Sequence, residues 1–340
     1  MHVISSSLFR RFSCARLTGW WAVALVTRGL LGATEPVVAA PIYTGPIAAG
    51  VMEVPPRREA SGLAASRRSP DVLWTHDDSE GAPVLYAMDT TGKKRGALRL
   101  RGVKNDDWED LTSFVQDGTA WLLVADTGDN DHKRKTVQIH VVEEPAPDRL
   151  SPERELELPP AYSLHIRYED GPHDTESVAV DVAERAIYLL TKRDSQPLLF
   201  RVPLGPAHQE VVVATRVGGV PHPGGSTEMD TMLRFLVGKK AAWPTGMNIS
   251  ADNRMAAVLT YGGVSVFVRS PGQSWPEALA GIPTALAFHG MLQAEGVCFS
   301  TDGRSIYVVS EGMVRLVRYD REETLPRDGA APTPTTQARQ

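Results

Sequence analysis

The chain has 340 residues, of which 42% are hydrophobic and 23% are charged, and its formal net charge at pH 7 is −5. That length accommodates one large all-β domain or two smaller domains, and the apolar fraction suits a packed globular core. The acidic balance excludes the broad basic face with which most such proteins bind nucleic acid, so we expect no nucleic-acid partner.

Residues 1–39 have the pattern of a secretory signal peptide. Three arginines between residues 10 and 16 precede a largely apolar stretch, 17–31, and a run of small residues, 37–40, follows. This order predicts cleavage after Ala39 and export to the periplasm or the extracellular space. The alternative is an uncleaved membrane anchor. Because Arg28 shortens the apolar run below what a bilayer core about 30 Å thick requires, we expect no membrane span after cleavage.

From about residue 57 to residue 320, one short pattern occurs five times. Each copy opens with a polar pair before an apolar residue: Ser61-Gly62-Leu63, Glu109-Asp110-Leu111, Glu176-Ser177-Val178, Thr245-Gly246-Met247 and Glu295-Gly296-Val297. An aliphatic run that ends in a small and then a polar residue follows 12 to 14 residues later. A third strand-like segment completes each copy, at 84–86, 137–139, 198–200, 264–266 and 314–316. Three short strands at a spacing of roughly 50 to 70 residues are typical of propeller blades.

The fold class that we predict is therefore all-β, a β-propeller with five clear blades that allows a degenerate sixth. Turn formers at 117–118, 252–253 and 302–303 indicate hairpins between first and second strands. The second and third gaps between copies are longer and leave room for a long loop or an added strand. The segment Tyr43 to Val54 could supply an outer strand to the last blade.

We expect one propeller domain over residues 40–325 and no long helix, with at best a short one at 228–233. The tail, 326–340, is rich in Pro, Thr and Ala, so it is predicted to be disordered. Cys298 lies in an apolar strand and is interpreted as a small buried hydrophobic residue.

The first residues of the five copies predict an acidic ring, because equivalent positions of inner strands meet at a propeller axis. Three of them, Glu109, Glu176 and Glu295, carry carboxylates, which repel one another unless protons, a cation or basic neighbours are present. Calcium accepts six to eight oxygen ligands and is the natural partner outside the cell. We therefore predict a calcium site formed by these three glutamates, assisted by Asp77 and Asp126, in a central channel.

Two alternatives to metal binding stay open at this point. Carboxylates at blade starts can hydrogen-bond the backbone of the neighbouring blade, and the aspartates of the loop 126–131 are also ordinary turn formers. Further acids stand near the repeated positions, in the run 106–110 and at Asp78 and Asp174.

The polar residues that end the second strands differ from copy to copy: His76, Asp126, Lys192, Tyr261 and Glu311. A purely structural position would tend towards one residue type, so this diversity favours a site. We expect Lys192 to neutralise an anionic group and His76 to move a proton. The alternative is that these side chains end strands in solvent.

The segments 60–63, 73–79, 107–111, 126–130 and 294–297 together resemble exported bacterial β-propeller proteins of the phytase-like and esterase-like groups. The resemblance covers roughly residues 57–320 and implies a propeller with an acidic, calcium-binding channel. A propeller phytase would also bring a basic cluster for the phosphates, whereas here only Lys192 and Arg193 are expected near the channel mouth.

These patterns predict an exported propeller that binds a divalent cation, calcium by preference, and a small anionic ligand or substrate. Whether it is an enzyme is left open; a metal-assisted hydrolase of the phosphatase, esterase or lactonase type is the chemistry we expect. The alternative is a non-catalytic propeller scaffold whose rim loops bind a protein or a glycan.

Overall fold

A computed structural model of the protein describes residues 41–322 except 55–58, 79–80, 208 and 224–237. The expected signal peptide, the expected disordered tail and the short helix expected at 228–233 lie outside the described residues. The described residues belong to one compact unit. None of their helices is long and apolar enough to cross a membrane.

Fifteen of the strands are the three strands of the five sequence repeats. The first strands are β2 (Ala60–Ala65), β6 (Trp108–Gln116), β11 (Thr175–Asp181), β15 (Pro244–Ile249) and β19 (Ala294–Phe299). The second strands are β3 (Val72–Asp77), β7 (Thr119–Asp126), β12 (Ala186–Thr191), β16 (Met255–Thr260) and β20 (Ser305–Ser310). The third strands are β4 (Val84–Asp89), β8 (Val137–Glu143), β13 (Leu198–Pro203), β17 (Gly263–Val268) and β21 (Met313–Arg321). Within each copy they pair antiparallel in chain order.

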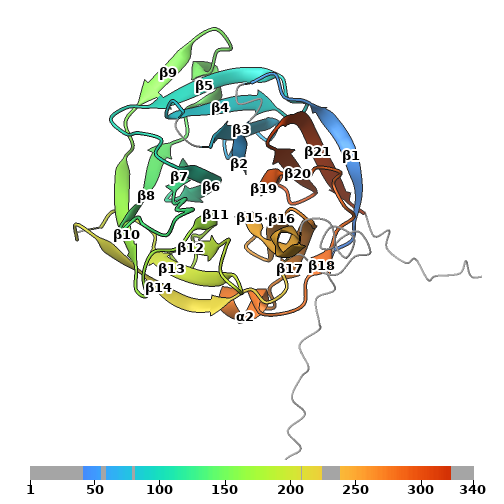
Figure 1. Cartoon of the computed structure of the whole chain (residues 1–340). Helices are drawn as coiled ribbons and strands as arrows, with labels where there is room; N and C mark the ends of the chain where they lie inside the picture. Colours follow the sequence, from blue (N-terminus) through green and yellow to red (C-terminus); the bar gives the residue numbers. More distant parts are fainter. Residues whose placement is uncertain (1–40, 55–58, 79–80, 208, 224–237, 323–340) are drawn as a thin grey trace, which may run out of the picture. The chain divides into compact units, whose positions relative to one another are not determined.

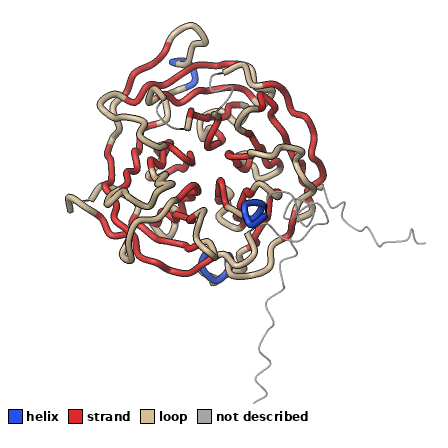
Figure 2. The backbone as a smooth tube through the Cα atoms, in the orientation of Figure 1, coloured by secondary structure: helices blue, strands red, loops and turns tan. Residues whose placement is uncertain are grey.

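The sheets stand around a common axis, with the five first strands innermost (Figure 1). Each innermost strand contacts its two neighbours, and β19 contacts β2. Figure 2 shows how little of the described chain is helical. Its helices are η1 (Pro147–Arg149), η2 (Gly238–Ala242) and α2 (Trp275–Leu279). The predicted all-β propeller fold is confirmed.

Outer strands complete the sheets: β1 (Tyr43–Val51), β5 (Lys94–Leu100), β9 (Glu155–Leu158), β10 (Tyr162–Tyr168), β14 (Val212–Gly219) and β18 (Thr284–Ala285). Strand β10 pairs parallel with β14 and joins two of the repeats into one eight-stranded sheet, so the described strands fall into four hydrogen-bonded sheets. The number of blades therefore stays a prediction.

The strand at the start of the described chain pairs with the strand at its end. β1 lies antiparallel to β21, with Tyr43 opposite Arg321 and Val51 opposite Arg315. The expectation that the segment after residue 43 supplies an outer strand to the last repeat is confirmed. Backbone hydrogen bonds between the two chain ends thus close the ring.

Both faces of the inner sheets are buried. In β12, Ile187 and Leu189 pack in one hydrophobic cluster, whereas Tyr188 and Leu190 pack in another. Successive side chains of a strand point to opposite faces, so a strand between two neighbouring sheets needs apolar residues at every position. Cys298 is also fully buried, as expected.

Candidate functional site

The three glutamates of the repeat each occupy a β-bulge at the start of an innermost strand. In the pairing of β6 with β7 the register shifts between Trp108 and Asp110, so Glu109 is the extra residue. Register shifts of the same kind flank Glu176 in β11 and Glu295 in β19. A bulge takes a side chain out of the regular alternation and aims it elsewhere. The position that the three glutamates share in the sequence repeat is therefore also a position where the backbone of the strand bulges.

Where the repeat has a hydroxyl residue instead, the position is structural. The hydroxyl of Ser61 donates to the carbonyl oxygen of Glu109, and that of Thr245 donates to the carbonyl oxygen of Ala294 at 2.6 Å. Each bond ties one innermost strand to the next. By contrast, no described residue hydrogen-bonds the side chain of Glu109, and those of Glu176 and Glu295 contact Lys192 and Tyr261 rather than a backbone carbonyl. The glutamates thus do not perform the backbone role of Ser61 and Thr245.

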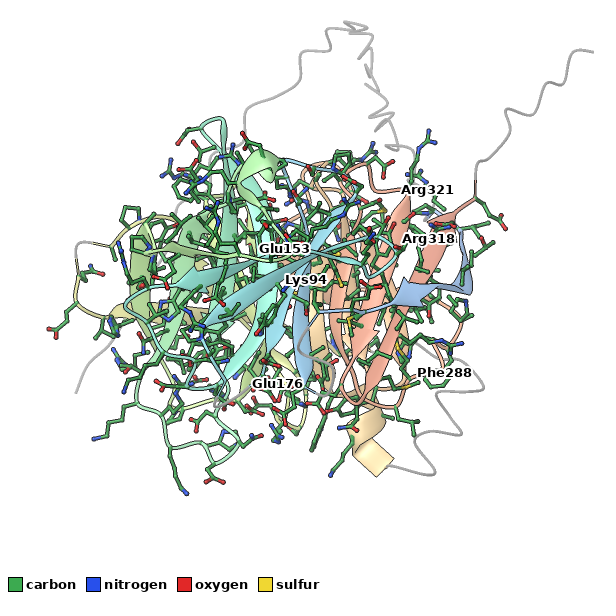
Figure 3. The ribbon with its side chains drawn as sticks, turned by 90° about the horizontal axis from the view of Figure 1, so that it is seen from above. Lys94, Glu153, Glu176, Phe288, Arg318 and Arg321 are labelled. Atoms are coloured by element: carbon green, nitrogen blue, oxygen red, sulfur yellow. The ribbon has the colours of Figure 1, made fainter. Side chains whose placement is uncertain are left out.

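The glutamates lie in a larger group of acids at one end of the innermost strands, where Figure 3 shows Glu176. One carboxylate oxygen from each of Asp78, Asp107 and Glu109 lies within 4.8 Å of the others, and the same holds for Glu109, Asp174 and Glu176. Glu295 is near enough to this group for its charge to interact with those of Glu176 and Lys192. We name as the acidic cluster Asp78, Asp107, Glu109, Asp174, Glu176 and Glu295.

Two basic side chains stand within the acidic cluster. The ammonium group of Lys192 bonds the carboxylate of Glu176 and lies 5.3 Å from the ring centroid of Tyr261. The Tyr261 hydroxyl in turn donates to Glu295 at 2.8 Å. Lys192 is buried, and burial would lower its pKa, but the charges of Glu176 and Glu295 outweigh burial and raise it. Lys192 therefore stays charged.

Arg193 is the second basic side chain. Its guanidinium bonds Asp174 and reaches Glu176 at 3.2 Å, and it lies 5.2 Å from the ring centroid of Trp243. The charge of Arg134 also acts on Asp107, so the six carboxyl groups meet three basic side chains among the described residues, and the acids remain in excess.

Burial shifts the pKa values of the acids towards neutrality. It raises the pKa of Glu176 to about 8 and those of Glu295 and Asp78 to about 7. The pKa of Glu109 lies well above its usual value, first because of burial and then because of the charge of Glu176. Since removal from water disfavours the ionised form, the cluster retains protons near neutral pH that a cation could displace.

Gly128 lies directly against the acidic cluster. A Cβ atom at this position would collide with Oε1 of Glu109 and Oδ2 of Asp107. A larger residue would require these two carboxylates to move away from the loop after β7.

Three of the residues predicted from the sequence are not members of the acidic cluster, and of these Asp126 is near enough for its charge to act on Asp107. The carboxylate of Asp126 is buried and pairs with Arg134 at 2.7 Å, and Asp77 belongs to neither group of converging acids. His76 is buried with its ring edge against Trp108, its Nδ1 lies 2.8 Å from the carbonyl oxygen of Asp77, and burial lowers its pKa to about 4. Asp126 is thus paired with Arg134, Asp78 rather than Asp77 belongs to a converging group, and His76 is buried; the roles expected of Asp77, Asp126 and His76 stay predictions.

Asp107 and Asp174 were noted from the sequence only as neighbouring acids. Each precedes a bulge glutamate by two residues, in Asp107-Trp108-Glu109 and Asp174-Thr175-Glu176. This recurring Asp-x-Glu spacing is the signal that distinguishes them from the other acids of the run 106–110. The remaining predicted residues, Glu109, Glu176, Glu295 and Lys192, are brought together.

Side chains also connect the innermost strands behind the glutamates. The carboxylate of Asp110 accepts hydrogen bonds from the amides of Leu111, Val178 and Met247 at 2.8, 2.8 and 3.1 Å. One layer further along the strands, Asn248 contacts Thr112 at 3.3 Å and accepts from the amide of Phe299 at 3.2 Å. The acids therefore form a cluster at one end of the strands, backed by this buried polar layer, and the expected central channel stays a prediction.

No protein-family model and no curated protein matches the chain. Solved structures with a similar fold include a gluconolactonase from Xanthomonas campestris (12% identity, 77% of this chain, 72% of that chain, TM-score 0.41). Others are a luciferin-regenerating enzyme (10% identity, 82% and 96%, TM-score 0.45) and the PQQ-bound aldose sugar dehydrogenase of Streptomyces coelicolor (11% identity, 83% and 100%, TM-score 0.42). We take no function from these likenesses and infer it from the side chains of the site.

Proposed function

We propose that the acidic cluster binds a divalent cation, calcium by preference, and that the bound cation holds a small anionic ligand at this end of the innermost strands. The two converging groups of acids share Glu109 and together supply carboxylates from Asp78, Asp107, Asp174 and Glu176. These donors are all hard oxygens, with no histidine or cysteine among them, which favours calcium or magnesium over zinc. Calcium accepts the larger and less regular oxygen shell.

The observation that carries the proposal is the environment of Glu109. Its side chain is almost completely buried, with 5% of the residue exposed, and it has no hydrogen-bond partner among the described residues. A carboxylate with so little exposure and no partner is unfavourable unless it binds a proton or a cation, and in the same cluster Oδ1 of Asp78 is fully buried without a hydrogen-bond partner in the described part of the chain. The side-chain ends of Glu109 and Asp107 both lie against Gly128, so the two carboxylates converge beside this loop.

The basic residues give the anionic ligand its counter-charge in this proposal. Lys192 and Arg193 now contact Glu176 and Asp174. A cation bound to these carboxylates would leave the positive charges of Lys192 and Arg193 partly available to a ligand. Arg193, Tyr261 and Trp243 are partly exposed and stand where a ligand would meet solvent.

The chemistry that we propose is hydrolysis of an ester, lactone or phosphate ester. A bound divalent cation polarises a carbonyl or phosphoryl oxygen and lowers the pKa of water. The side chains of Lys192 and Arg193 would orient the anionic group of the substrate. Calcium is abundant outside the cytoplasm, which agrees with the export that we propose from the N-terminal pattern.

Metal analysis and thermal unfolding test the cation. We expect purified protein to contain calcium by mass spectrometry, and its melting temperature to rise when calcium is added after chelation. Glu109→Gln should abolish that rise, whereas Glu157→Gln, at an exposed position of β9, should leave it unchanged. If calcium and magnesium both fail to raise the melting temperature of the wild-type protein, the proposal is wrong.

A panel of ester, lactone and phosphate substrates tests the chemistry. Hydrolysis that needs calcium and is lost in Glu176→Gln is the expected result. Hydrolysis that persists unchanged in both Glu176→Gln and Glu109→Gln would separate the activity from the acidic cluster.

A further inference from the structure

A cavity of about 370 Å³ lies at the opposite end of the innermost strands from the acidic cluster. Its walls come from the last residues of β6, β11 and β15, among them Phe114, Val180 and Ile249, and from Arg67 just after β2. From Glu109 to Val115, strand β6 advances by roughly 20 Å at ~3.3 Å per residue. The hydrogen-bonded layer around Asp110 and Asn248 lies between, so the cavity and the cluster are separate.

Arg67 is the cation of this cavity. Its Nε and Nη2 donate to the carbonyl oxygen of Ser113 at 3.1 and 2.9 Å, and Nε also contacts the Ser113 hydroxyl at 3.0 Å. Its Nη1 has no hydrogen-bond partner among the described residues, and no described carboxylate lies within ion-pair distance of the guanidinium. Burial lowers the pKa of Arg67, while Cys298 and Glu144 act in the opposite direction. A partly buried guanidinium with a free donor is a ready partner for an anion.

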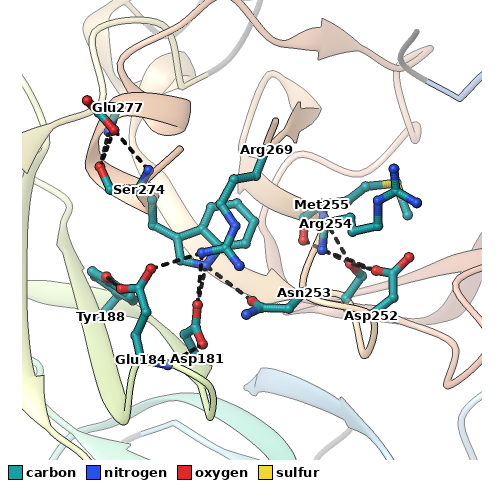
Figure 4. Close-up of polar contacts among 12 residues, drawn as sticks. Asp181, Glu184, Tyr188, Asp252, Asn253, Arg254, Met255, Arg269, Ser274 and Glu277 are labelled. Carbon is teal, nitrogen blue, oxygen red and sulfur yellow. Dashed lines mark hydrogen bonds and ion pairs between the residues drawn. The ribbon is translucent and has the colours of Figure 1, made fainter. Parts of the chain in front are cut away.

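The acids closest to this end of the strands already accept hydrogen bonds from other groups. Arg269 contacts Asp181 and Glu184, each at 3.0 Å, and the indole nitrogen of Trp275 donates to Asp181 at 2.9 Å (Figure 4). Glu144 uses its two oxygens for the amide of Arg67 and the indole of Trp74. The residues that line the cavity include no acid. An anion that enters would therefore meet Arg67 with no carboxylate in the cavity wall, and the charge of Glu144, which also acts on Arg67, lies outside that lining.

The rest of the wall is largely apolar. Val115, Val180, Val182 and Ile249 line the cavity, and Val115 is 46% exposed, which is unusual for a valine of an innermost strand. Cavities of about 300 Å³ and more, with apolar walls and a few fixed polar groups, are typical of small-molecule sites.

We propose that this cavity binds a small organic carboxylate with an apolar body, whose carboxylate pairs with Arg67 and whose body packs against the valines and Ile249. This site is independent of the cation at the acidic cluster. The opposite ends of the innermost strands thus carry opposite chemistry, one selecting a cation and the other an anion.

Calorimetric titration of the full-length protein with sodium benzoate, and with benzyl alcohol as an uncharged analogue, tests the proposal. We expect saturable binding of benzoate, at least tenfold tighter than of the alcohol. Arg67→Met keeps the apolar stem and should weaken benzoate binding at least tenfold. Adding EDTA should change nothing, because the acidic cluster takes no part.

A second variant decides the matter if Arg67→Met fails to fold. Val115→Asp places a negative charge on an exposed wall position, so it should keep the melting temperature and still weaken benzoate binding at least tenfold. The proposal is overturned by equal binding of benzoate and alcohol, by unchanged binding in a folded variant, or by no binding up to about 10 mM benzoate. Loss of binding with EDTA would also overturn it, by placing the anion at the cation site.

Discussion

The carboxylate of Asp110 on β6 accepts a hydrogen bond from the amide of Met247 on β15, although 137 residues separate them in the chain. The same carboxylate accepts from the amide of Val178 on β11. Asp110 therefore fixes three innermost strands against one another directly behind Glu109. Because Glu176 lies two residues before Val178, this contact also sets the distance between the two glutamates.

Replacing Asp110 by Asn should destabilise the protein by about 2 to 4 kcal/mol, because the amide group has only one acceptor oxygen for three backbone donors and buried unsatisfied donors are costly. Urea unfolding measures the difference. Asp148→Asn, at an exposed position, is the control and should stay within about 0.5 kcal/mol of wild type. Equal stability of the two variants would show that Asp110 does not hold the strands together.

The raised pKa values predict an unusual dependence of stability on pH in the absence of a cation. Glu176 and Glu295 titrate near 4.5 in the unfolded chain but near pH 8 and 7 in the folded protein. Between these values the folded state binds more protons than the unfolded state. The free energy of unfolding should therefore fall as pH rises from about 4.5 to about 8.

Chemical unfolding in EDTA across that pH range measures the effect. Saturating calcium should remove most of the loss, because the cation then takes the place of the protons. Stability that rises with pH in EDTA would contradict the assigned pKa directions.

Replacing Lys192 by Met should destabilise the protein most strongly at high pH. Lys192 is the buried counter-charge of Glu176, and breaking a buried ion pair costs about 3 to 5 kcal/mol. At pH 5 the neighbouring glutamates would be protonated, so the loss should be much smaller. Unfolding at pH 5 and pH 8 tests this, and a loss independent of pH would show that Lys192 acts through packing alone.

Gly128→Ala should weaken calcium binding at least tenfold, because the new methyl group collides with the carboxylates of Glu109 and Asp107. The matched control is Gly218→Ala, where the added atom meets only ordinary contacts of 3.5 Å or more. A calcium titration followed by intrinsic fluorescence measures both. Unchanged affinity in Gly128→Ala would place the cation away from these two side chains.

Much of the fold could be predicted because every repeat of a propeller needs the same kinds of strands and turns, and these leave the same pattern in the sequence. Strands buried on both faces read as continuous apolar runs, and turns such as Asp117-Gly118, with φ values of 51° and 76°, need residues that tolerate the left-handed region. The room for an added strand in the first long gap is filled by β9 and β10. Their parallel pairing with β5 and β14 was not predictable, because these strands lie outside the repeat.

The site was predictable where it follows the repeat and not where loops decide it. Glu109, Glu176 and Glu295 share one position, so symmetry alone gathers them. Asp126 ends its strand as expected, but the loop after it folds back and brings Arg134 to its carboxylate. A partner eight residues away on an irregular loop leaves no pattern in the sequence.

The most direct test is a crystal structure of the protein grown with calcium, with the cation located by its anomalous scattering. The account predicts a calcium ion at about 2.3 to 2.6 Å from a carboxylate oxygen of Glu109, with further ligands from Asp107, Asp78, Asp174 or Glu176. Crystals that hold calcium elsewhere, or that show Glu109 hydrogen-bonded only to protein groups, would contradict it.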